Sequence, residues 1–355
     1  MPLVMVCLGA ALAQDGDNEP LLSGELRFEV QADHVVDADS VAAERNIYFS
    51  TTELAADLRL TPHILLHADL VVEPIDDAGG DLFFEDHGVF FETLHVAVDL
   101  DALTLWAGKA NPAFGTAYDP GVSEGVYAVD FAEDYEVVER IGIGGAYAYD
   151  AGALGAQTLS AAVFFADTTE LSRSYGAERG RAGLEDGGAS NTEDLSSFAI
   201  ALDGANIPAA PGLSYHLAVR LQGAGRGDAG DDFGVVAGLV QGLDAGSHRL
   251  NLQAEAAYFE NFDGGPQDAA YISAGAIAFQ REWFANAGVA ARDFSGGPSG
   301  SDFTDYQVRA GVGRNLVGPT LLEAGYRFLR QEKQDSHTVG VWFVYSAPFA
   351  FNAWP

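Results

Sequence analysis

The chain has 355 residues, with 52 Asp and Glu against 18 Lys and Arg, so its formal net charge is −34. This charge excludes a nucleic-acid partner, because a polyanion repels phosphates. The single cysteine, Cys7, excludes a disulfide framework, and no stretch after the N-terminus reaches the roughly 20 apolar residues of a membrane-spanning helix.

Residues 1–13 are predicted to be a signal peptide. An apolar run ends in Ala11-Leu12-Ala13, which fits the small-residue pattern of cleavage before Gln14. The run is short and has no basic residues at its start, so the true start is expected upstream of Met1. A buried first strand is the alternative interpretation. We expect an exported protein with a single domain over residues 14–355.

From Ser23 onward, apolar residues alternate with polar or small ones in segments of about ten residues. A period of two is that of a β-strand, which predicts an all-β protein with about sixteen strands. The apolar phase changes between Phe49 and Leu54, which predicts a β-bulge. In chain order, the predicted strands are 25–31, 46–60, 63–73, 89–100, 103–109, 141–149, 158–165, 198–202, 213–222, 233–240, 249–258, 271–279, 283–293, 305–315, 321–330 and 337–345.

The links between these strands alternate in length. Longer links, rich in glycine and acidic residues, include 110–139 and 167–194. An even-stranded membrane barrel has short periplasmic turns at one rim and long extracellular loops at the other, so both termini are expected in the periplasm. The short links are 61–62, 99–101, 150–153, 206–212, 244–247, 281–282 and 316–319.

Each strand has one face free of charge, as Leu26, Phe28 and Val30 show in the first. In hydrocarbon an outward Arg or Lys costs about 2–4 kcal/mol, so lipid requires such a face. A soluble sandwich with an apolar core is the alternative. Strand number, alternating link lengths and the export signal favour a transmembrane antiparallel β-barrel in contact with outer-membrane lipid and lipopolysaccharide.

The segment 108–115 reads Gly-Lys-Ala-Asn-Pro-Ala-Phe-Gly and opens a long link between the fifth and sixth predicted strands. Together with 130–135 and 139–142, it resembles porins of Gram-negative bacteria, and its Pro-x-Phe-Gly element resembles the third loop of general porins. The resemblance implies a loop that folds into the barrel and narrows it, and a homotrimer. Ala113 departs from the acidic residue usual there, and a surface cap is the alternative. The motif residues are Lys109, Asn111, Pro112, Phe114 and Gly115.

The same link carries a surplus of carboxylates, flanked only by Lys109 and Arg140. Carboxylates at a narrow, water-filled constriction raise the local cation concentration, so we expect a preference for cations. The carboxylates expected at the constriction are Asp119, Glu124, Asp130, Glu133, Asp134 and Glu136.

Five arginines are predicted on the interior faces of the first two and last few strands, which are neighbours after closure. They are expected to form a basic wall opposite the loop. Ion pairs with Glu25, Glu29, Asp57 and Glu323 are the alternative role. The five are Arg27, Arg59, Arg292, Arg309 and Arg327.

Residues 338–345 resemble the terminal-strand signal of outer-membrane proteins, in which a glycine precedes alternating aromatic residues. The resemblance implies that Gly340, Phe343 and Tyr345 are recognised by the barrel-assembly machinery. An ordinary edge strand is the alternative, and residues 346–355 extend beyond the usual end.

Other chemistry is sparse in the sequence. His63 and His67 share one strand face, which favours a structural polar pair over a metal site. We expect no metal and no cofactor, and find no Ser and His arrangement typical of a barrel hydrolase. The sequence therefore predicts a passive diffusion porin for small hydrophilic solutes, not an enzyme. The alternatives are an outer-membrane hydrolase and a plugged structural or adhesive barrel.

Overall fold

The computed structural model describes residues 20–40, 43–75, 80–118, 125–128, 131–297 and 302–352. The predicted signal peptide, with Cys7 and the cleavage site before Gln14, lies outside these residues. The strands are β1 (Leu22–Ala38), β2 (Asn46–Thr61), β3 (Ile64–Pro74), β4 (Leu82–Phe83), β5 (His87–Leu100), β6 (Leu103–Ala110), β7 (Arg140–Asp150), β8 (Ala156–Ala166), β9 (Tyr175–Gly176), β10 (Ser197–Ala205), β11 (Leu213–Gln222), β12 (Asp232–Ala245), β13 (His248–Glu260), β14 (Asp268–Gln280), β15 (Trp283–Ser295), β16 (Phe303–Asn315), β17 (Thr320–Gln331) and β18 (Gln334–Phe351). Short 3-10 helices lie in the links, namely η2 (Glu133–Tyr135), η3 (Gly152–Leu154), η4 (Glu170–Ser172), η5 (Leu184–Asp186) and η6 (Phe262–Gly264).

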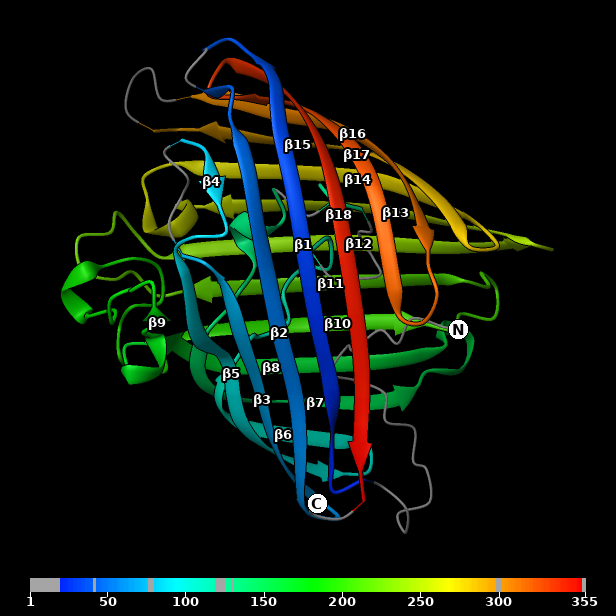
Figure 1. Ribbon diagram of the computed structural model, residues 1–355. Helices are drawn as coiled ribbons and strands as arrows, with labels where there is room; N and C mark the ends of the chain where they lie inside the picture. The colour runs from blue at the N-terminus through cyan, green and yellow to red at the C-terminus, as the bar shows by residue number, and fades with distance from the viewer. Residues whose placement is uncertain are drawn as a thin grey trace.

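Sixteen of these strands form a closed antiparallel barrel, shown in Figure 1, and the two-residue strands β4 and β9 lie at its rim. Each barrel strand pairs with the next along the chain, and β8 pairs with β10. The ring closes where β1 pairs with β18, from Leu22 opposite Phe351 to Ala38 opposite Ser336. Closure satisfies the backbone groups that an open sheet would leave at its edges. The predicted sixteen-stranded all-β barrel is confirmed.

The two faces of the barrel wall have opposite polarity. Leu217 and Val308 on the outer face expose 48% and 45% of their surface, whereas the adjacent His216 and Gln307 expose 3% and 1%. In strands from different parts of the ring the large side chains of the outer face are thus apolar, whereas the interior face carries the polar side chains together with buried aromatic rings such as Phe259. A water-soluble barrel would place them the other way round, because burying polar groups costs free energy and burying apolar ones gains it. This outer surface is suited to hydrocarbon.

Strand positions agree with the sequence pattern, but the predicted bulge and several strand ends were wrong, most of all for β1, which spans Leu22–Ala38 where 25–31 was predicted. The predicted bulge between Phe49 and Leu54 is absent, because β2 pairs with β1 in continuous register from Asn46 to Leu58. Phe49 opposes Gln31 on the interior face, so an apolar ring sits inside the barrel without any inserted residue. The predicted final strand ended at Tyr345, but β18 continues to Phe351.

Connections between barrel strands are mostly short at one rim and long at the other, as predicted, with two exceptions. The link 206–212 at the short-turn rim has seven residues, as many as 39–45 and 261–267 at the other rim. The link from β17 to β18 belongs to the long-loop rim but has only the residues Glu332 and Lys333. At the same rim β3 stops short of the end of β2, and β4 pairs in parallel with Ile47 and Tyr48. This pairing covers an edge of β2 that would otherwise be exposed.

The terminal strand provides a first testable prediction. Phe343 and Tyr345 lie on the outer face of β18, opposite Val30 and Phe28 of β1, so they belong to the seam that closes the barrel. We expect Phe343→Ala with Tyr345→Ala to lower the amount of folded barrel in the membrane severalfold, because the final strand both closes the ring and carries the predicted assembly signal. Folded protein is measured as the fraction whose gel migration changes on boiling.

Val317→Ala is the matched control, since Val317 is an apolar residue in the turn before β17 and is 96% exposed. It should accumulate like wild type. Wild-type levels of the double variant would show that these two rings do not serve as the signal.

Candidate functional site

Residues 111–139 connect β6 to β7, yet their partners lie on strands around the opposite part of the ring. Near its start, Phe114 is fully buried against Phe259 of β13, with ring centroids 5.8 Å apart. Gly115 follows with φ of +85°, a conformation that favours glycine. Its N–H donates to Nε2 of His216 on β11 at 3.0 Å. Because Nε2 is then an acceptor, the proton sits on Nδ1 and is donated to Asp203 at 2.8 Å.

Glu255 on β13 is the central anchor of this segment. One carboxylate oxygen accepts from the backbone N–H and hydroxyl of Thr116, at 2.7 and 3.0 Å. The other oxygen accepts from the N–H of Ala117 at 3.2 Å and from the Tyr135 hydroxyl at 2.7 Å. Burial raises the pKa of the Tyr135 phenol and the Glu255 carboxylate raises it further, so the phenol remains a donor. A single buried carboxylate thus holds both ends of the segment.

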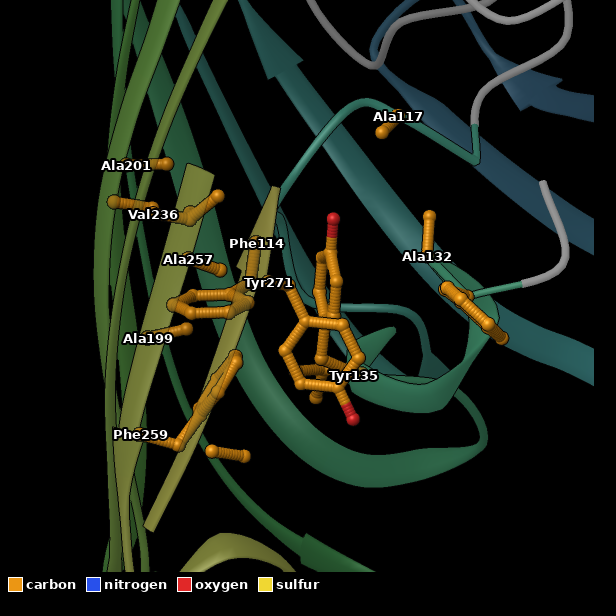
Figure 2. Packing of buried hydrophobic residues seen from close by; sticks show 14 of the residues in the cluster. Phe114, Ala117, Ala132, Tyr135, Ala199, Ala201, Val236, Ala257, Phe259 and Tyr271 are labelled. Carbon is orange, nitrogen blue, oxygen red and sulfur yellow. The ribbon is translucent and has the colours of Figure 1, made fainter. Parts of the chain in front are cut away.

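Aromatic packing reinforces this anchor. Tyr135 packs against Phe259 and Tyr271, with centroids 5.6 and 4.9 Å away (Figure 2). The guanidinium of Arg220 on β11 lies 4.8 Å from the Phe114 centroid and 4.6 Å from that of Phe259. It also donates to the Tyr135 carbonyl at 2.6 Å and to Asp232 at 2.8 Å. The buried Arg220 charge therefore has both a counterion and π faces.

The segment extends as far as the seam of the barrel. The N–H of Val126 donates to Glu323 on β17 at 3.3 Å, and the Tyr127 hydroxyl donates to Asp33 on β1 at 2.8 Å. Gly325 and Gly340 face these two residues, and a Cβ at either glycine would collide with Val126 or Tyr127. Gly340, assigned from the sequence to the assembly signal, therefore also makes room for the Tyr127 ring.

On its return the segment meets β14 and β15. Asp134 accepts from Arg292 at 2.6 Å and from the Tyr271 hydroxyl at 3.0 Å, and Arg292 also pairs with Asp305 at 2.9 Å. Glu133 beside it is exposed, and Glu136 is half-buried. Asp119, Glu124 and Asp130 lie outside the described residues. That these six carboxylates line a constriction stays a prediction.

The base of the segment is fixed by a network centred on Glu139. Lys109 is fully buried and donates to Glu139 at 2.7 Å, and it pairs with Asp167 at 3.0 Å. Arg179, from the link before β10, binds both oxygens of Glu139 at 2.7 Å. Asn111 accepts from the Glu139 N–H at 2.9 Å and donates to Glu92 of β5 at 2.6 Å. The predicted motif residues Lys109 and Asn111 thus hold the two ends of the segment together, and Pro112 is buried between Asn111 and Phe114.

The five arginines of the predicted basic wall do not form one cluster. Arg309 and Arg327 are directly opposite each other on β16 and β17, and Arg327 lies 4.7 Å from the centroid of the Tyr127 ring. Arg292 is held by Asp134 and Asp305, whereas Arg27 pairs with Glu29 on its own strand. Arg59 donates to the carbonyl of Pro62 at the short turn after β2.

Sequence reasoning missed Glu255, Arg220 and Tyr127 as anchors. Glu255 and Arg220 were placed correctly on interior faces by their alternation, but nothing local marks them as partners of a segment about 100 residues away or more. In the described part of the chain, no group of three or more His, Cys, Asp or Glu is placed to hold a metal ion. Over the same ranges, no helix is long and apolar enough to cross a membrane.

Comparisons with known proteins give a likeness of fold. No family model and no curated protein matches the chain. Among solved structures, the outer membrane channel DcaP of Acinetobacter baumannii has a TM-score of 0.56 at 11% identity, over 92% of this chain and 96% of that one.

Two further structures have the same architecture. OpdK of Pseudomonas aeruginosa, solved with vanillate, has a TM-score of 0.54 at 10% identity, covering 92% of this chain and 99% of its own. OmpT, an outer membrane protein of Vibrio cholerae solved in a trimer form, has a TM-score of 0.53 at 10% identity, over 93% and 100%. At these identities the likeness establishes the barrel fold.

Glu255 is the residue whose loss should cost most stability at this site. Glu255→Ala leaves the Thr116, Ala117 and Tyr135 donors without their acceptor, so the free energy of unfolding should fall by about 3–5 kcal/mol. The free energy of unfolding is measured by urea titration of the detergent-folded protein, with tryptophan fluorescence as the signal. Glu282→Ala is the control, because the Glu282 side chain forms an exposed ion pair with Arg314 at 3.3 Å and its loss should cost less than about 1 kcal/mol. Equal losses in the two variants would contradict the anchoring role.

Proposed function

We propose that this chain is a passive porin in the outer membrane of a Gram-negative bacterium, where it forms a water-filled channel for small hydrophilic solutes. The observation that carries the proposal is the inverted polarity of the wall, with apolar residues such as Leu217 outside and polar residues such as His216 inside. A barrel of this kind is stable in lipid and offers polar groups to water along its axis. The fold likeness to DcaP, an outer membrane channel, supports the same conclusion.

The 111–139 segment is proposed to narrow this channel. Its contacts with interior side chains of β11, β13, β15, β17 and β1 support an inward fold, as the resemblance to the third loop of general porins implies. Narrowing makes fixed charge effective, because a solute must then pass within a few ångströms of the wall. The excess of carboxylates in the chain gives the channel a preference for cations.

Transport in this proposal is hydrated diffusion without covalent chemistry, and the chain is not an enzyme. Its partners are outer-membrane lipid and lipopolysaccharide, the barrel-assembly machinery and the solutes themselves. A homotrimer is the proposed assembly, which the trimer form of OmpT supports by analogy of fold. A plugged structural barrel is the alternative that conductance excludes directly.

Planar-bilayer recording tests the proposal. The purified protein should insert in steps of constant conductance, and under a KCl gradient its reversal potential should have the cation-selective sign. The preference should be clear in dilute salt and fade near 1 M, because the Debye length falls from about 10 Å at 0.1 M to about 3 Å. Folded protein without conductance would favour the plugged barrel.

A variant with Asp130→Asn, Glu133→Gln and Asp134→Asn should have a smaller preference than wild type, because it removes negative charge from the segment. The same lipid, salt gradient and protein preparation serve for both proteins. A wild-type potential of the anion-selective sign, or a variant with an unchanged potential, would show that these carboxylates do not face the path.

A further inference from the structure

We infer that solutes pass along one side of the barrel, between the 111–139 segment and the wall formed by β1, β2, β3 and β5, and that carboxylates on this wall set the cation preference. This inference rests on the proposed channel function and assigns the residues that select the solute. We call the interior face of these four strands the acidic wall. Its carboxylates include Glu29, Glu53, Asp57, Asp69, Glu73 and Glu92.

The first observation is that the segment covers the opposite side of the interior. Its described contacts run from β11 and β13 through β14 and β15 to β17, and then reach the upper part of β1 at Asp33. Phe114, Phe131, Tyr135 and Val137 of the segment join one buried apolar cluster with side chains of β8 and of β10 to β15. Such packing excludes water, so this half of the interior is not available to a hydrated solute.

The second observation is the difference in exposure between the two sides. On the covered side, Gln253 exposes 8% of its surface, Glu255 3%, and Gln307 and Glu323 1% each. On the acidic wall, the side chains of Asp57, Asp69 and Glu29 expose 43%, 26% and 18%. Glu53, Glu73 and Glu92 are half-buried. The interior faces of β1, β2 and β3 are therefore more open to water than those of β13 to β16, although Thr93 and His95 on β5 are only 5% and 4% exposed and the Asp203 side chain on β10 is 41% exposed.

The third observation concerns which carboxylates are already neutralised. On the covered side, Asp134 is paired with Arg292, Asp232 with Arg220, and Glu139 with Lys109 and Arg179. On the acidic wall Arg27 pairs with Glu29, and His67 pairs with both Asp57 and Asp69. The charged neighbours of Glu73 include Glu92 and Glu53, and those of Glu53 include Arg27, Glu29 and Glu92. Among the described residues Glu53, Glu73 and Glu92 form no ion pair, so these three are the carboxylates of the wall without a paired cation.

The charges also extend along the direction of transport. Glu73 lies near the end of β3 at the long-loop rim, Asp69 is lower on the same strand, and Asp57 opposes His67 close to the short turn. His67 lies between the last two, with its ring nitrogens 2.7 Å from Asp57 and 3.1 Å from Asp69. Because His67 pairs with Asp57 and Asp69, the negative charge that would attract a cation is concentrated at Glu53, Glu73 and Glu92, nearer the long-loop rim.

Two sets of charge-removing variants test the assignment. The variant with Glu53→Gln, Glu73→Gln and Glu92→Gln should lower the permeability ratio of K⁺ over Cl⁻ in dilute KCl by about threefold or more, since a unit charge at about 6 Å in water changes a local concentration by about that factor. Its loss should exceed that of the variant with Asp130→Asn, Glu133→Gln and Asp134→Asn. An equal or larger loss in the second variant would overturn the inference.

Accessibility of single cysteines locates the route independently of charge. In a Cys7→Ser background, Glu53→Cys and Thr51→Cys introduce thiols on the acidic wall, and Gln307→Cys introduces one on the covered side. A methanethiosulfonate carrying a trimethylammonium group should reduce single-channel conductance in steps at the first two positions and leave Gln307→Cys unchanged. Thr51→Cys keeps the test valid if Glu53→Cys fails to fold, as judged by gel migration before and after boiling.

The outcomes separate this inference from the channel function. A conducting protein in which Gln307→Cys responds and the acidic-wall cysteines do not would overturn the route while leaving the porin intact. Folded protein that never conducts would reject the porin itself. Steps at Thr51→Cys or Glu53→Cys alone, together with the larger loss of selectivity in the acidic-wall variant, would support the inference.

Discussion

Backbone hydrogen bonding around a closed ring of strands is the constraint on which the rest of this structure depends. Each of the sixteen strands forms backbone hydrogen bonds with the strands on both sides, and the pairing of β1 with β18 removes the last free edges. Because strand side chains alternate, the ring must present two unlike surfaces, one to the surroundings and one to the interior. The apolar outer surface and the polar interior both follow from that alternation.

The polar interior creates a second requirement, since buried polar groups need hydrogen-bond partners. The two sides of the interior obtain these partners in different ways. On one side, residues 111–139 supply backbone donors, hydroxyls and aromatic rings to Glu255, Arg220 and Glu323. On the other side, Asp57 and Asp69 are paired with His67, and their side chains are 43% and 26% exposed. The two sides of the barrel interior therefore differ in how far protein groups cover their polar side chains.

Period-two alternation was sufficient to predict the strands, because each strand of a closed barrel meets the same two environments along its whole length. The segment 213–222 was predicted to the residue. The pattern failed where an interior position is apolar, as at Phe49, since alternation cannot distinguish an inward ring from an inserted residue. The end of β18 was also missed, because Ala347, Pro348 and Ala350 carry little contrast between the faces.

For the candidate site, sequence alone located the segment and its motif but not its partners. The contacts of Thr116 with Glu255 and of Val126 with Glu323 join residues 139 and 197 positions apart, and only the register of the barrel brings them together. Loop carboxylates were expected to act as free charges. The pairing of Asp134 with Arg292 depends on how far along the barrel axis Arg292 of β15 lies relative to the segment. The lengths of strands and links in the sequence do not specify that position.

The long reach of residues 111–139 also constrains the order of folding. The segment is synthesised before two thirds of the barrel strands. Tyr127 contacts Asp33 of β1 and packs against Gly325 of β17 and Gly340 of β18, so Tyr127 has its full set of neighbours only after the last strand has been added. Contacts of such sequence separation form late, after the entropy of closing a very long loop has been overcome. Glu323 therefore has no Val126 partner until β17 is in place, whereas the contacts with β11 and β13 need neither β17 nor β18. Docking of Tyr127 beside Gly340 is the step that completes the fold of the segment, after the last strand has been added.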